Sequence, residues 1–298
     1  MKNMKASRIL SNTLIYVILI VMSIIWLAPL VWLVLQSFGE GGIKVRAQLI
    51  PEDFTFDNYL WLFSNFTGKT NPLATNHAYD GLFFGWFCNT LVVAILTCII
   101  NTIFVLGTAY GLSRFRFKSR SLFMKINLVI GMFPGFLGMI ITFYILKQVN
   151  LTNGFNAIFG LILVNISGAV MGYYVSKGFF DTISKSLDEA AMIDGANKNT
   201  IFWRVIMPLS KPIIVYTVLL GFTGPWGDYM FASVMAGGDS KLFNVAVGLK
   251  QLMSKEAGTS GFPIFCAAGV IVSIPIMTLF FFLQRYYVEG VTGGAVKG

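Results

Sequence analysis

Charge is what this sequence has least of: only 12% of its 298 residues are Asp, Glu, Lys or Arg, whereas 56% are hydrophobic. A soluble domain usually carries about 25% charged residues, which cover its surface with groups that water solvates. So low a charge content excludes an ordinary soluble enzyme, a disordered protein and a nucleic-acid-binding module. The mean hydropathy of +0.73 and the aromatic content of 15% are instead typical of a chain that lies in lipid.

The sequence also lacks the residues of redox, metal and nucleotide chemistry. Its three cysteines, Cys88, Cys98 and Cys266, fall in apolar stretches, so a disulfide framework is not expected. A single histidine, His77, provides no cluster for a metal site, and we interpret it as a surface residue. The phosphate-binding pattern G-x-x-x-x-G-K-[ST] does not occur. We therefore expect no cofactor in this chain.

Long apolar runs take up most of the chain. A bilayer core about 30 Å thick is crossed by roughly 20 apolar residues in helical form. The first run follows three basic residues but is too long for the apolar part of a signal peptide, so we interpret it as a retained span. The predicted fold is an all-α integral membrane protein. Six transmembrane helices are predicted in a single membrane domain of residues 1–298, at approximately 14–35, 86–113, 126–146, 157–176, 212–236 and 262–284.

The distribution of basic residues predicts the orientation of these helices. Lys and Arg are enriched in the cytoplasmic loops of membrane proteins. If the N-terminus is cytoplasmic, 15 of the 22 basic residues lie in segments on that side and seven lie outside. Both termini are therefore expected in the cytoplasm, and residues 36–85 are expected to form a long extracytoplasmic loop. Because the positive charge reports topology, it does not support a nucleic acid as a partner.

The segment of residues 177–211 is the most informative part of the sequence. Ser186 and Glu189 have the spacing of a capping box, in which two side chains satisfy backbone amides at a helix start. Gly195 is suited to the turn that ends a helix. This pattern predicts a short capped helix over residues 186–195 on the cytoplasmic surface. From these features alone, two interpretations remain open. The helix is either a rigid surface feature that binds a partner or a simple connector between spans.

The same segment resembles the EAA loop of bacterial ABC importer permeases. Glu189–Ala191 (EAA) is followed by Asp194–Gly195 (DG) and then by Pro208–Pro212 (PLSKP). The C-terminal run of residues 284–298 and the stretch Gly224–Tyr229 (GPWGDY) are similar to the carbohydrate-uptake branch of these permeases, in particular to the MalG type of maltose and maltodextrin systems. The resemblance extends from the first apolar run to the last residue.

This resemblance implies a type I ABC importer permease fold and a set of partners. It implies a homologous second permease subunit, an extracytoplasmic solute-binding protein, a sugar or oligosaccharide substrate, and the bacterial plasma (inner) membrane as the location. It also implies a cytoplasmic ATPase dimer that binds ATP and Mg, so this chain would not itself be catalytic. The residues that the resemblance assigns to coupling with the ATPase are Glu189, Ala190, Ala191, Asp194 and Gly195.

The residues around Asp228 are a second candidate site. Asp228 is the only ionisable residue well inside a predicted span, and such a charge is by default a functional hypothesis. Pro225 has no N–H for the helix ladder, so we expect the helix to break here. Trp226 offers a flat apolar face and Tyr229 a hydroxyl, which suit contact with a sugar ring. Two interpretations stay open: Asp228 contacts substrate, or it caps the broken helix or pairs with a partner subunit.

An alternative from another class is an ion-coupled secondary transporter of a small solute. Such a transporter is expected to carry several acids or a proton relay within its spans, and Asp228 alone is a poor candidate for that chemistry. A membrane-embedded enzyme has less support still, because the sequence offers neither a catalytic triad nor a metal-ligand cluster.

Overall fold

The structure is a computed structural model of the chain. It describes residues 2–40, 49–68, 80–132, 135–168, 170–253 and 261–295. His77 and the last three residues lie outside the described residues. Within the described ranges every regular element is a helix, and two residues, Gly39 and Phe54, form an isolated bridge. The all-α prediction is therefore confirmed for this part of the chain.

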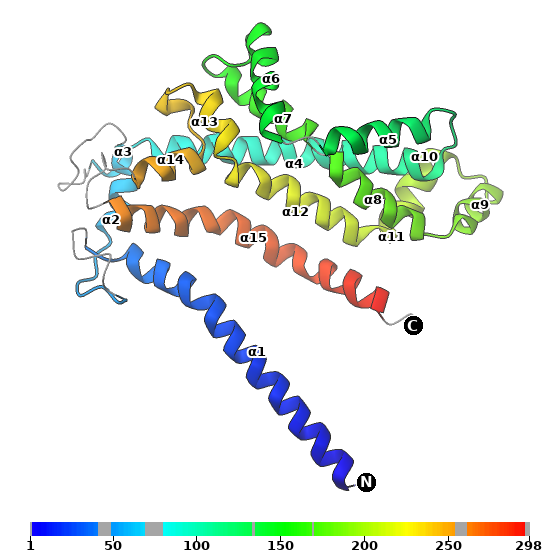
Figure 1. Cartoon of the computed structure of the whole chain (residues 1–298), viewed down its shortest axis with the longest axis horizontal. Coiled ribbons are helices and arrows are strands. Elements are labelled where there is room, and N and C mark those ends of the chain that lie inside the picture. The colour runs from blue at the N-terminus through cyan, green and yellow to red at the C-terminus, as the bar shows by residue number, and fades with distance from the viewer. Residues whose placement is uncertain are drawn as a thin grey trace. The chain divides into compact units, whose positions relative to one another are not determined.

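Figure 1 labels most of the helices. In chain order they are α1 (Lys2–Ser37), α2 (Asp57–Leu62), α3 (Ser64–Thr67), α4 (Phe83–Arg114), α5 (Arg120–Gly131), α6 (Gly135–Gln148), α7 (Asn156–Ser167), α8 (Val170–Thr182), α9 (Lys185–Ile193), α10 (Lys198–Ile201), the π-helical turn η2 (Phe202–Ile206), α11 (Met207–Leu209), α12 (Lys211–Gly227), α13 (Met230–Ala236), the 3₁₀ turn η3 (Ser240–Leu242), α14 (Val245–Leu252) and α15 (Gly261–Ala295).

The chain divides into two compact units, and the first contains residues 1–83 and 249–271. A group of polar side-chain hydrogen bonds in this unit lies at the end of α1. The Asn58 side-chain amide is buried and donates to the carbonyl oxygens of Ser37 and Gly39 at 2.9 and 2.8 Å. The Ser37 hydroxyl lies 2.7 Å from that of Tyr59. Part of the loop predicted at residues 36–85 is thus folded into short helices against the end of α1.

The second unit, residues 84–248 and 272–298, is built around α4. Residues in the first turns of α4 form hydrogen bonds with a segment that lies more than 150 residues later in the sequence. Trp86 Nε1 donates to the Ser240 carbonyl at 2.7 Å, and the Val245 N–H donates to the Thr90 hydroxyl at 2.8 Å. Gly248 lies against the Trp86 ring so closely that a Cβ there would come within 2.0 Å of it. These contacts fix one end of the unit.

Three of the six predicted spans lie within single long helices. By length and composition, three helical stretches are able to cross a membrane: Ser11–Ser37 of α1, Phe83–Arg114 and Gly261–Tyr286 of α15. The number rises to five if each of two bent helix pairs is counted as one span. These counts apply to the described residues.

The other three predicted spans are each divided between two helices. The division within residues 212–236 was predicted, whereas no division was predicted within residues 126–146 or 157–176. Residues 126–146 are divided between α5 and α6, residues 157–176 between α7 and α8, and residues 212–236 between α12 and α13. A helix of 12–14 residues is about 20 Å long, which is less than the bilayer core. Each break falls near a glycine or proline, residues that loosen or interrupt the helical hydrogen-bond ladder.

Candidate functional site

The predicted cytoplasmic helix exists as α9, but it begins earlier than the sequence indicated. Ser184 is its N-cap, and the Ser184 hydroxyl accepts a hydrogen bond from the Ser186 N–H at 3.3 Å. Ser186 lies inside the first turn, so the predicted capping box with Glu189 was wrong. The two serines stand two positions apart, and the sequence pattern selected the second because an acid follows it at the right spacing.

The end of α9 matches the prediction. Gly195 has a φ of +83°, in the left-handed region that favours glycine. The Ala196 N–H donates to the Ala191 carbonyl at 2.9 Å, and the Gly195 N–H donates to the Met192 carbonyl at 3.0 Å. This pair of bonds is the Schellman motif. Open space surrounds the position of a Cβ at Gly195, so the backbone angle, and not crowding, requires glycine.

An ion pair attaches α9 to the end of α4. Arg114, the last residue of α4, places its Nε 3.0 Å from Asp188 Oδ2, and the two side chains are only 5% and 14% exposed. The same guanidinium donates from its second terminal nitrogen to the Ile183 carbonyl at 2.9 Å. The sequence analysis missed this pair, because the two residues are 74 positions apart and no local pattern connects them.

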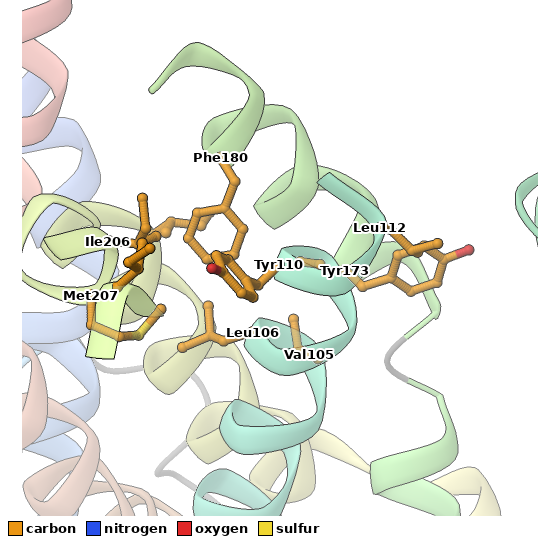
Figure 2. Packing of buried hydrophobic residues seen from close by; sticks show 11 residues of the cluster. Val105, Leu106, Tyr110, Leu112, Tyr173, Phe180, Ile206 and Met207 are labelled. Atoms are coloured by element: carbon orange, nitrogen blue, oxygen red, sulfur yellow. The ribbon is translucent and has the colours of Figure 1, made fainter. Parts of the chain in front are cut away.

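A hydrophobic cluster supports α9 from beneath. It joins residues of α4, α8, α10, η2, α11 and α12, and Figure 2 shows the rings of Tyr110 and Phe180 at its centre. The Tyr110 ring lies 4.7 Å from that of Phe202 and 6.3 Å from that of Phe180, measured between centroids. Ala191 packs against this cluster. The second alanine of the EAA sequence therefore has a packing role.

The opposite side of α9 is exposed. Glu189 and Ala190 are exposed, together with the apolar side chains of Met192 and Ile193. Ile193 is 87% exposed, in a helix that is anchored at both ends. An exposed apolar surface beside an acid on a rigid element is typical of a surface that binds another protein.

A second polar contact joins α4 to the end of α8, beyond the predicted span 157–176. The Ser113 hydroxyl donates to Asp181 Oδ1 at 2.6 Å, and Lys177 donates to Asp181 Oδ2. Burial alone would raise the pKa of the Asp181 carboxyl, but these hydrogen bonds outweigh it and the pKa lies below its usual value. Asp181 is therefore ionised near neutral pH and holds the two helix ends together.

A sharp elbow connects this region to α12. The helical segment Lys198–Leu209 and the helix Lys211–Gly227 meet at 84°. The segment contains the π-helical turn Phe202–Ile206, where the Met207 N–H donates to the Phe202 carbonyl. Pro208 follows directly and has no N–H to continue the ladder. The Ser210 hydroxyl donates to the Ile206 carbonyl at 2.7 Å and helps to close the elbow.

The break predicted near Asp228 is present. The first helix of the pair, α12, ends at Gly227, and α13 begins at Met230. Asp228 Oδ1 accepts from the Phe231 N–H at 3.1 Å, in the first turn of α13. The Asn244 side-chain amide donates to the Asp228 carbonyl at 2.6 Å, and its own oxygen accepts from the Val247 N–H at 2.9 Å. This is the geometry of the capping interpretation.

The two aromatic neighbours of Asp228 lie in different surroundings. Trp226 is 5% exposed, and its indole packs against Phe87 and Phe222 with ring centroids 5.6 and 5.9 Å apart. In this conformation the indole is thus part of the core and offers no free stacking face. Tyr229 is 44% exposed and remains accessible.

A polar cavity of about 250 Å³ lies among α4, α7, α8 and α12. The hydroxyl of Thr97 and the side-chain oxygen of Asn101 are buried there without a hydrogen-bond partner among the described residues. Water or a hydroxylated ligand would satisfy such groups. The sequence analysis missed this cavity because it searched the spans for ionisable residues, whereas the polar groups here are neutral. The lining also includes Asn165, Tyr216, Thr217 and four glycines.

Comparison with known proteins identifies the family. The family described as "Binding-protein-dependent transport system inner membrane component" matches residues 103–293, which include α9 and the break at Asp228. The chain belongs to this family. As a permease subunit of such a transport system it is not an enzyme, and membership in the family decides against the alternative of an ion-coupled secondary transporter.

Relatives from three bacteria extend the match over the whole chain. The galactooligosaccharides transport system permease protein GanQ of Bacillus subtilis is 33% identical, with 99% of each chain covered. The maltodextrin transport system permease protein MalD of Streptococcus pneumoniae is 31% identical, again with 99% of each covered. The maltose/maltodextrin transport system permease protein MalG of Vibrio vulnificus is 31% identical, over 91% of this chain and 90% of that protein. The resemblance to MalG-type permeases is confirmed.

A solved structure shares the fold. A chain from the crystal structure of a bacterial ABC transporter that imports the acidic polysaccharide alginate superimposes with a TM-score of 0.72. The match covers 94% of this chain and 98% of that chain at 23% sequence identity. This chain therefore shares the fold of a chain of that ABC transporter.

The first prediction concerns the Arg114–Asp188 pair. Removing one partner of a buried ion pair leaves the other charge uncompensated, at a cost of roughly 3–5 kcal/mol. We expect Arg114→Gln to lower the thermal unfolding temperature of the assembled transporter clearly. Lys177→Gln, which removes one partner of the more exposed Lys177–Asp181 pair, should cost less, about 1 kcal/mol. Equal effects of the two variants would contradict the anchoring role of Arg114.

The second prediction concerns the cap at Asp228. Asp228→Asn retains an oxygen that accepts from the Phe231 N–H, so assembly should be unchanged. Asp228→Ala removes the cap and should cost about 1 kcal/mol. Both variants are compared by thermal unfolding and by substrate uptake in vesicles. If Asp228→Asn assembles normally but transports poorly, the charge itself acts in transport; if both variants assemble like the wild type, the cap is unimportant.

Proposed function

We propose that this chain is a transmembrane permease subunit of an ATP-driven, binding-protein-dependent importer of sugars or oligosaccharides. It forms half of the translocation pathway and works by alternating access. The substrates named for the relatives support a carbohydrate: galactooligosaccharides for GanQ, maltodextrin for MalD and alginate for the solved transporter. A homologous second permease supplies the other half of the pathway, and an extracytoplasmic solute-binding protein delivers the substrate.

The observation that carries the proposal is the construction of α9. This helix is capped at both ends, anchored by Arg114 and exposed on its outer side. We propose that it is the coupling helix, which seats in a cleft of an ATPase dimer that binds ATP and Mg. Glu189 and Ala190 lie on its exposed side, Ala191 packs against the cluster beneath it, and Asp194 with Gly195 forms the turn at its end. A motion of the ATPase would then reach α4 through the ion pair.

The same proposal includes the topology. Residues 1–298 form one transmembrane domain with six spans and both termini in the cytoplasm of a bacterium. The third, fourth and fifth spans would then be broken helices. Non-helical backbone inside a membrane is tolerated where protein or a water-filled cavity surrounds it, and the broken spans border the polar cavity or contact one another.

The substrate path is proposed to include the polar cavity and the exposed Tyr229. Neutral hydroxyl and amide groups suit a sugar, which presents donors and acceptors and little charge. Trp226 would shape the break between α12 and α13 by packing against Phe222, and Asp228 would cap the start of α13.

The third prediction tests coupling through two positions. Glu189→Lys reverses the charge offered to the ATPase, whereas Glu189→Gln keeps the shape and most of the polarity. Gly195→Val forces a β-branched residue to a positive φ, whereas Gly195→Asn tolerates that conformation better. We expect Glu189→Lys and Gly195→Val to lose ATPase subunits in a pull-down, or to lose stimulation of ATP hydrolysis by loaded binding protein. The two matched variants should keep both properties largely intact.

Sugar uptake into reconstituted vesicles completes this test. Normal uptake and normal ATPase retention in Glu189→Lys and Gly195→Val would show that α9 is only a connector.

The fourth prediction tests orientation. Cys88, Cys98 and Cys266 are first replaced by serine, and single cysteines are then placed at the exposed positions Asp53 and Asn199. An impermeant thiol reagent added to intact cells should label Asp53→Cys without lysis and Asn199→Cys only after lysis. Labelling of both positions from the same side would contradict the six-span topology.

A further inference from the structure

An apolar groove lies where α4 ends and α5 begins. It has a volume of about 480 Å³. Its walls come from the last turns of α4, the connection after Arg114 and the first two turns of α5. Leu122, Phe123 and Ile126 are all largely exposed along it. The remaining lining residues are Thr108, Gly111, Leu112, Phe115, Phe117 and Ser119.

A second groove of about 630 Å³ adjoins the first, and Phe117 lines both. Four cationic side chains line this second groove: Arg116, Lys118, Arg120 and Lys125. None of the residues lining it is acidic. Among the described residues, no ion pair involves Arg116, Lys118 or Lys125. Three of these four cations thus have no ion-pair partner among the residues that the structure describes, and they lie directly beside an apolar groove.

The start of α5 adds to this positive field. Its first turn contains no acidic residue, and its N-cap, Ser119, makes no side-chain capping bond. The first amide groups of a helix carry a partial positive charge and favour an anion nearby. Within the wall of the basic groove α5 is held to α8, because the Tyr174 hydroxyl donates to the Met124 carbonyl at 2.8 Å. The basic groove is therefore a fixed feature and not a loose loop.

We propose that the two grooves together bind one anionic glycerophospholipid of the membrane, with its phosphate among Arg116, Lys118 and Lys125 and an acyl chain along Gly111 and Ile126. A lipid of this kind uses both grooves, because its phosphate needs the basic groove and its acyl chain needs the apolar groove. A soluble phosphate would leave the apolar groove empty, and a zwitterionic lipid would leave Arg116, Lys118 and Lys125 largely uncompensated. Basic pockets between membrane helices are sites of this kind, and α4 is long and apolar enough to cross the bilayer.

The bound lipid would act on the same structure that holds α9. Phe115, in the apolar groove, lies 5.7 Å from the Tyr110 ring of the hydrophobic cluster. The Lys198 ammonium group lies over the same Phe115 ring, 4.9 Å from its centre. Arg114, next in the chain, binds Asp188. A lipid in the groove would therefore stiffen the end of α4, and its loss would weaken coupling while leaving substrate delivery unchanged.

The experiment uses the assembled transporter with its ATPase. Native mass spectrometry measures lipid retained after exchange into phosphatidylglycerol or phosphatidylcholine, and a titration of phosphatidylglycerol into vesicles measures stimulated ATP hydrolysis. Two variants remove the two halves of the site. Arg116→Gln with Lys118→Gln and Lys125→Gln removes the charges, and Gly111→Leu fills the apolar groove, where a Cβ meets open space.

Each variant has a matched control. Lys2→Gln with Lys5→Gln and Arg8→Gln removes the same charge elsewhere on the side proposed to be cytoplasmic. Gly107→Leu makes the same change one turn earlier in α4, outside the groove and again in open space.

We expect the wild type and both controls to retain one phosphatidylglycerol. The charge variant should bind it about a hundredfold more weakly, since each Lys or Arg near an anionic surface contributes roughly fivefold in affinity. Gly111→Leu should lose the lipid although every charge remains.

Several results would overturn the proposal. Equal retention of phosphatidylcholine would show ordinary surrounding lipid, and displacement by glycerol phosphate would show a phosphate site without an acyl chain. Protection of Leu122→Cys from a lipid-soluble maleimide in every lipid mixture would show that a protein partner covers the groove. The sugar assignment is tested separately, because uptake by the wild type would support it whatever lipid is bound.

Discussion

The buried ion pair between Arg114 and Asp188 is the constraint on which the arrangement at this end of the molecule depends. It joins the last residue of a long membrane helix to the first turn of a short surface helix. A helix of nine residues is marginally stable alone. Here its caps satisfy the backbone, the cluster around Tyr110 supplies apolar contacts, and Arg114 fixes its direction. The exposed side of α9 can be presented to a partner because the other side is held so firmly.

Polar contacts connect the ends of α4, α8 and α9 in this region. Charged groups in low-dielectric surroundings interact strongly but are costly to separate. The Arg114–Asp188 pair, which joins α4 to α9, and the Ser113–Asp181 hydrogen bond, which joins α4 to α8, therefore resist relative motion of these three helices. Movement applied to α9 would be shared with both membrane helices instead of being lost in a flexible loop.

Local patterns in the sequence predicted the local features of this structure. The turn at Gly195 and the break near Asp228 were predicted, because each depends on the backbone preferences of one or two residues. The Arg114–Asp188 pair and the cavity beside Thr97 could not be found in this way, since they join residues distant in sequence. Hydropathy averages over windows, so it did not predict the divisions of residues 126–146 and 157–176 into two helices each.

The elbow between the segment Lys198–Leu209 and α12 has a geometric consequence. The segment Lys198–Leu209 and α12 are two nearly perpendicular arms that meet at 84°. If the two arms rotate as one rigid body about Ser210, a rotation of the short arm turns α12 through the same angle. The distance moved at the far end grows with the length of the long arm. At 17 residues, α12 is about 25 Å long, so a rotation of ten degrees or so at the corner would carry Gly227 through roughly 4 Å, enough to part or close the contacts beside Asp228.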